Sequence, residues 1–154
     1  MIPETTSRVA RNTAESINEQ IRRQTEENVA RVAAAGPGAI DRRLAELDRE
    51  WDIERMLEAN AASVALVGLG LGAFVDRRWF ILPAVVAGFL LQHAIQGWCP
   101  PVPLFRRLGV RTQTEIDYER YALKALRGDF QQLPPEGYGA ARTSATRALG
   151  AVQR

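Results

Sequence analysis

Residues 59–98 read ANAASVALVGLGLGAFVDRRWFILPAVVAGFLLQHAIQGW and decide the fold of this chain. Residues 59–75 carry no ionisable side chain, and residues 79–98 carry only His93. Because a helix rises about 1.5 Å per residue, the second segment is about 30 Å long, which is the thickness of the hydrocarbon core of a bilayer. Residues 76–78 leave room only for a tight turn. The stretch therefore predicts two antiparallel transmembrane helices, joined as a hairpin.

The charged residues lie on both sides of this apolar stretch, which is not the distribution of a globular domain. The formal net charge is only +2, a weak indication of contact with anionic lipid head groups and not of nucleic-acid binding. Residues 1–31 are polar throughout, so we expect no cleaved export signal.

The sequence predicts an all-α chain of five segments. Gly36-Pro37-Gly38 ends the first, and no Gly or Pro lies between residue 40 and Asn60, so we expect one long helix to enter the membrane there. Thr112 and Glu115 have the spacing of a capping box. The segments are a polar helical arm (1–38), an amphipathic helix (39–58), the transmembrane hairpin (59–98), a Pro-rich interfacial turn with a surface helix (99–130) and a disordered tail (131–154).

The arginines predict the orientation of the hairpin. Arg77 and Arg78 lie in the turn, and a larger number flank the hairpin, so the positive-inside rule places both termini in the cytoplasm. Residues 104–108 form a short basic stretch that suits the head-group layer. The flanking arginines are Arg42, Arg43, Arg49, Arg55, Arg106, Arg107 and Arg111.

Small residues recur at helical spacing on both apolar segments. Gly68 and Gly72 form one pair, and Ala84 and Gly88 form the other. Such pairs let helix backbones approach closely, either within the hairpin or between protomers. The alternative is that glycine is simply frequent in transmembrane helices.

Polar side chains gather near the end of the second segment. Gln92, His93 and Gln96 lie at the depth that hairpin symmetry assigns to Asn60 and Ser63. We expect these side chains to form interhelical hydrogen bonds, with interfacial exposure as one alternative and a proton-bearing or metal-binding His93 as another. One histidine and one cysteine per chain cannot complete a usual metal site, so the sequence indicates no metal and no cofactor.

Cys99 follows the hairpin and allows three interpretations: a buried structural thiol, a reactive thiol for sulfur transfer or redox chemistry, and an acylation site. A nucleophilic cysteine needs a base beside it, and His93 lies six residues away on another face of the helix. The structural interpretation is therefore favoured, and no catalytic residue is predicted.

Gly97-Trp98-Cys99-Pro100, followed by residues 108–112 (Leu-Gly-Val-Arg-Thr), resembles the transmembrane domain of YgaP-type inner-membrane proteins. The resemblance covers about residues 51–112. It implies a bacterial inner-membrane hairpin that self-associates and that, in some members, anchors a cytoplasmic rhodanese domain. Here Pro101 and Pro103 lengthen the spacing, and the residues before the hairpin carry no rhodanese motif. The resemblance therefore implies the anchor without the sulfur transfer.

These observations predict a non-enzymatic membrane anchor or assembly subunit that binds a partner through its cytoplasmic helices. The expected partners are the lipid bilayer and further copies of the chain or a larger membrane complex, with no nucleic acid and no small-molecule substrate. Two alternatives remain open. One is a thiol or sulfur relay through Cys99 with a separate cytoplasmic protein, and the other is a small oligomeric pore or transporter component lined by Gln92, His93 and Gln96.

Overall fold

The computed structural model describes residues 4–131 and 147–152, and within these residues it is helical with no strand. The all-α prediction is confirmed. The chain divides into two compact units. Unit 1 comprises Met1–Gln24 and Trp51–Ile116, and unit 2 comprises Thr25–Glu50 and Asp117–Arg154.

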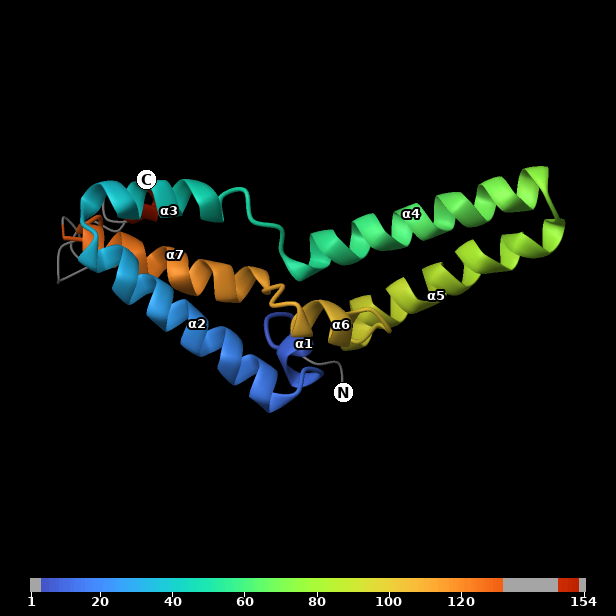
Figure 1. Ribbon diagram of the computed structural model, residues 1–154, viewed down its shortest axis with the longest axis horizontal. Helices are drawn as coiled ribbons and strands as arrows, with labels where there is room; N and C mark the ends of the chain where they lie inside the picture. Colours follow the sequence, from blue (N-terminus) through green and yellow to red (C-terminus); the bar gives the residue numbers. More distant parts are fainter. Residues whose placement is uncertain (1–3, 132–146, 153–154) are drawn as a thin grey trace. The chain divides into compact units, whose positions relative to one another are not determined.

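Unit 1 is built on two long antiparallel helices, α4 (Ile53–Phe74) and α5 (Ile81–Gln96), joined through the short 3₁₀ helix η1 (Arg77–Phe80) (Figure 1). α4, and the continuous stretch Arg77–Gln96, are long and apolar enough to cross a membrane. Only 22% and 6% of their most apolar windows are buried, so most of this apolar surface faces outward.

The predicted single helix from residue 40 into the apolar stretch is wrong. α3 (Pro37–Leu47) ends before residue 48, and α4 begins only at Ile53. The Asp52 side chain causes the new start, because it accepts a hydrogen bond of 2.9 Å from the Arg55 backbone N–H. This is the N-cap interaction that begins many helices.

The second apolar helix also ends slightly earlier than predicted. Gly97 closes α5 with a left-handed φ of 76°, and its N–H donates to the His93 carbonyl at 2.7 Å. The prolines then lead into α6 (Val102–Arg107), where Pro103 lies in the first turn and leaves no hydrogen bond unmade. α1 (Arg8–Arg11) and α6 both lie at the open end of the hairpin, opposite η1 (Figure 1).

Two helices, α2 (Glu15–Ala34) and α7 (Gln113–Arg127), contribute residues to both units. The expected stop after α2 is confirmed: Gly36 has a φ of 88°, and Pro37 starts α3. The capping box of α7 is also confirmed. The Thr112 N–H donates to Glu115 at 2.8 Å, and the Glu115 N–H donates to the Thr112 hydroxyl at 3.3 Å.

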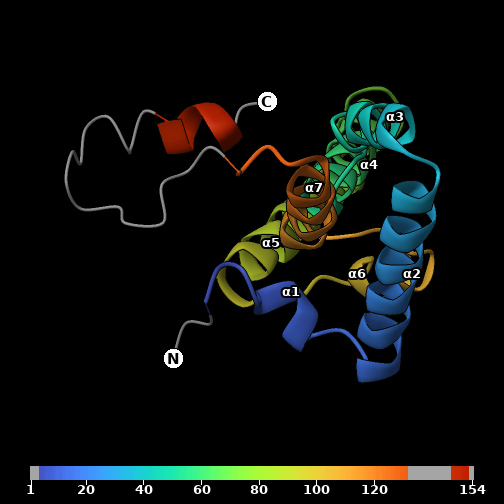
Figure 2. The same cartoon turned by 90° about the vertical axis from the view of Figure 1, so that its left-hand side faces the viewer.

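Within unit 2, α3 and α7 lie side by side (Figures 1 and 2). Two arginine–carboxylate pairs join them, Arg43–Glu119 at 2.7 Å and Arg127–Asp41 at 2.6 Å. A third, Arg120–Asp48, joins α7 to the residue that follows α3. Leu44, Leu47 and Leu123 are buried, as the apolar spacing of amphipathic helices requires.

The predicted disordered tail falls mostly outside the described residues. Of this tail the structure describes Gln131 and residues 147–152, and the latter form a helical turn. Lys124 on α7 donates to the Val152 carbonyl, and Ala151 is buried. Both contacts lie within unit 2.

Candidate functional site

The open end of the hairpin holds a three-residue polar network. The His93 Nε2–H donates to Glu54 Oε2 at 2.7 Å, and Arg8 Nη2 donates to Glu54 Oε1 at 2.8 Å. His93 is only 4% exposed, and its Nδ1 has no partner among the described residues. One carboxylate on α4 therefore connects α5 with the N-terminal helix α1.

Hydrogen bonds from Asn12 and a close approach at Gly97 also hold α1 against the end of α5. The Asn12 side-chain amide donates to the Gln96 carbonyl and to the Arg8 carbonyl, both at 2.8 Å. A Cβ at Gly97 would lie 2.6 Å from the carbonyl group of Arg8. Glycine at this position therefore serves both the left-handed turn and the close approach of the two backbones.

The structure does not assemble the polar cluster that hairpin symmetry predicts. The Ser63 hydroxyl donates to the Ala59 carbonyl of its own helix at 2.8 Å. Asn60 and Gln96 are exposed, and Gln92 is half-buried. Of the five predicted residues, His93 is the one whose side chain forms an interhelical hydrogen bond that the structure records, and its partner is Glu54.

Sequence reasoning missed Glu54 and Arg8 because their contacts are distant along the chain, with separations of 39 and 46 residues. A buried imidazole N–H needs an acceptor, and an ionised carboxylate is a stronger one than an amide or a hydroxyl. Glu54 is the acidic residue in the first turn of α4, and that position does not indicate which residues it contacts.

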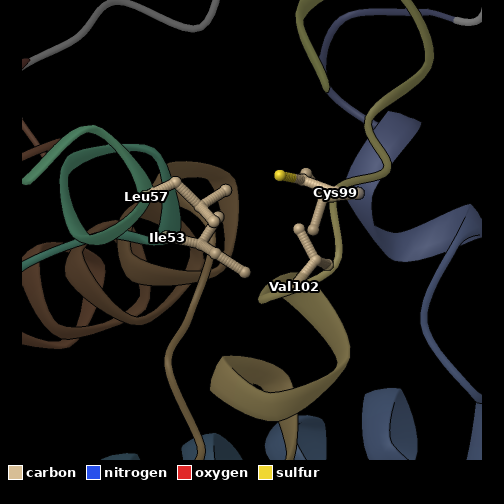
Figure 3. Close-up of a cluster of buried hydrophobic side chains, with 5 residues drawn as sticks. Ile53, Leu57, Cys99 and Val102 are labelled. Atoms are coloured by element: carbon tan, nitrogen blue, oxygen red, sulfur yellow. The ribbon is translucent and has the colours of Figure 1, made fainter. Parts of the chain in front are cut away.

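Cys99 lies in a small apolar cluster next to this network (Figure 3). The thiol points toward Ile53 and Leu57 of α4, and the cluster also includes Val9 and Val102. Cys99 is 6% exposed, and burial raises the pKa of its thiol. A raised pKa lowers the fraction of thiolate, which is the nucleophilic form, so this environment suits a structural thiol.

An apolar cavity of about 280 Å³ opens between α4 and α5 beside Cys99. Its walls include Leu57, Phe89 and Pro100, together with the polar residue Asn60. Such a cavity accommodates an apolar group and offers no set of convergent polar atoms for catalysis.

The two predicted pairs of small residues have different surroundings. A Cβ at Gly68 would lie 2.7 Å from Pro83, and a Cβ at Gly72 would lie 2.7 Å from Phe80. Both glycines therefore face the returning chain at close range. Ala84 is exposed, and Gly88 has no atom within 4 Å of an added Cβ, so this second pair faces away from α4.

The prediction that Arg106 belongs to a head-group stretch is wrong. Arg106 is 1% exposed and donates to both carboxylate oxygens of Glu115 at 2.7 Å, and also to Asn18 at 3.0 Å. Burial raises the pKa of Glu115, but hydrogen bonds from Arg106 and Thr112 lower it more, so the net pKa lies below the ordinary value. Arg107 and Leu108 of the same stretch are exposed.

Within the described part of the chain, no three side chains of the metal-ligating types come together. No family model, curated protein or solved structure matches the chain.

Proposed function

We propose that this chain is an integral protein of the bacterial inner membrane whose α4–α5 hairpin crosses the bilayer, with both termini in the cytoplasm. The outward face of the hairpin is the observation that supports insertion. Large apolar side chains are exposed along both helices, and such a surface is typical of a membrane-facing or protein-facing site. Examples with their exposures are Leu66 (68%), Val67 (58%), Phe74 (90%), Ile81 (69%) and Leu91 (64%).

The placement of charge supports the same proposal. No charged side chain lies in α4 after Glu58, and the charges of the turn begin only at Asp76. The one titratable residue of α5, His93, points inward to Glu54 and is buried. The lipid-facing surface is therefore free of ionisable groups, as the cost of placing a charge in hydrocarbon requires.

We propose further that the protein is a non-enzymatic anchor or assembly subunit, working as an oligomer or within a larger membrane complex. The exposed pair Ala84 and Gly88 offers a close-packing face to another transmembrane helix. On α7, Tyr118, Tyr121 and Leu126 are exposed and give a cytoplasmic partner an aromatic surface.

Accessibility of single cysteines in intact bacterial cells tests insertion and orientation together. In a Cys99→Ala background, Val75→Cys at the turn should react with a membrane-impermeant maleimide. Thr5→Cys should react only after the inner membrane is permeabilised. Labelling of Thr5→Cys in intact cells would reverse the orientation, and recovery of the protein in the soluble fraction would reject insertion.

A further inference from the structure

The turn of the hairpin carries two arginines without a carboxylate partner. Arg77 and Arg78 are exposed, and neither forms an ion pair or a side-chain hydrogen bond with any described residue. Asp76 precedes them, but its Oδ1 accepts from the Arg78 backbone N–H at 2.8 Å and lies in no ion pair with either guanidinium. Both guanidinium groups therefore retain all their donors for an external anion.

Several arginines that pack against other parts of the chain are neutralised internally. Five of them form ion pairs with carboxylates: Arg8–Glu54, Arg43–Glu119, Arg106–Glu115, Arg120–Asp48 and Arg127–Asp41. The turn differs because its two positive charges face only the one negative charge of Asp76. A net positive charge is thus left at the end of an otherwise apolar hairpin.

The turn is also held in a defined conformation. The Asp76 N–H donates to the Leu71 carbonyl at 3.0 Å, and the Trp79 N–H donates to the Asp76 carbonyl at 3.0 Å. The Phe80 ring packs against Gly72 and fixes the start of α5. Trp79 is 43% exposed, and tryptophan with an exposed ring is typical of the membrane–water interface.

We propose that the turn binds anionic phospholipid head groups of the leaflet opposite the termini. This inference rests on the insertion proposed above. Arg77 and Arg78 donate to phosphate oxygens, because the planar guanidinium matches a phosphate in charge and geometry, while Trp79 lies at the boundary with the acyl chains. A basic residue near an anionic surface strengthens association by about fivefold.

Fluorescence of Trp79 measures the local lipid composition directly. The full-length chain with Trp51→Phe and Trp98→Phe, so that Trp79 is its single tryptophan, is placed in vesicles of equal phosphatidylglycerol and phosphatidylcholine. One of the two lipids carries brominated acyl chains, which quench tryptophan on contact. We expect the anionic lipid to be enriched at Trp79 by about fivefold or more, and the enrichment to fall in high salt.

Variants test whether the two arginines of the turn cause the enrichment of anionic lipid at Trp79. Replacing Arg77 and Arg78 together by Gln should bring the two lipids to equal quenching. This change removes positive charge from the turn and so preserves the predicted orientation. The matched control replaces two exposed arginines outside the hairpin, Arg42 and Arg107, by Gln, and it should keep the enrichment.

The possible failures are distinguishable. If neither brominated lipid quenches Trp79, the hairpin is not inserted, and the proposed function itself fails. If both lipids quench equally in the parent chain, the hairpin is inserted but the turn has no preference for anionic lipid. Enrichment that persists after Arg77 and Arg78 are replaced would also overturn the inference, because the arginines would not be its cause.

Discussion

The two ends of the hairpin hold α4 and α5 together by different means. Near the turn, Gly68 and Gly72 let the returning chain approach so closely that a single added Cβ would lie 2.7 Å from it. At the open end, a carboxylate bridges Arg8 and His93 over a buried apolar cluster. Close backbone packing is therefore sufficient where no polar group is buried, whereas a buried polar group needs a hydrogen-bond partner.

The contrast extends to the arginines of unit 1. At the open end, Arg8 and Arg106 are paired with Glu54 and Glu115, whereas the arginines of the turn have no such partner. Paired arginines stabilise the fold, and unpaired ones are available to another molecule.

Replacing Glu115 by Ala should lower the free energy of unfolding by about 3–5 kcal/mol, because it leaves the guanidinium of Arg106 buried without a counter-charge. Denaturant titration in detergent micelles, followed by circular dichroism, measures the change. The control replaces both partners, Arg106→Met with Glu115→Leu, and should recover most of the loss. A small effect of Glu115→Ala alone would show that the pair is solvated.

The Arg106–Glu115 pair should also make the free energy of unfolding depend on pH under acidic conditions. The pKa of Glu115 is lowered in the folded state, so its contribution is fully present above the ordinary glutamate pKa of about 4.3 and is lost as pH falls through the lowered value. The difference in unfolding free energy between the parent chain and Glu115→Ala should therefore shrink below about pH 4. A difference that stays constant across this range would assign the stability to another group.

A larger side chain should affect stability differently in the two small-residue pairs. Gly72→Leu forces a side chain against Phe80 and should cost about 2 kcal/mol, seen as a lower thermal midpoint in detergent. Gly88→Leu is the matched control on α5, because nothing lies within 4 Å of its added Cβ, and it should change monomer stability by less than about 0.5 kcal/mol. If Gly88→Leu instead reduces the yield of oligomer, the exposed pair contacts another protomer. Equal midpoints for both variants would show that the turn end is loosely packed.

Local signals predicted much of the fold, and distant contacts account for what was missed. The two long apolar helices, the capping box at Thr112 and the stop at Gly36 are each specified within a few residues. The break before α4 also has a local cause, because Asp52 is a good N-cap. The helix-forming residues on both sides of Asp52 nevertheless favoured the prediction of one continuous helix. The pairing of Glu54 with Arg8 and His93 has no local signal, because hydropathy does not say which charge meets which.

The smallest expected effect concerns Cys99, where a structural and a chemical role predict different outcomes. Burial in an apolar cluster and a raised thiol pKa favour the structural role. Cys99→Ser should then lower the free energy of unfolding by about 1 kcal/mol, because it places a hydroxyl among apolar side chains. Cys99→Ala is the companion variant, since it removes the thiol without adding a polar group and separates lost packing from the cost of the hydroxyl.

A thiol relay predicts the opposite pattern for Cys99. Serine is close to cysteine in size but is a far poorer nucleophile, so Cys99→Ser would leave assembly intact and abolish sulfur transfer to a partner. Mass spectrometry of the protein purified from its native membrane should find Cys99 as a free thiol. A persulfide on Cys99 would reverse our preference, because sulfur reaches a cysteine in that form only when the thiol is accessible to a donor. The apolar cluster around Cys99 would then have to open during function, so the open end of the hairpin would not be a permanently closed contact between α4 and its neighbours.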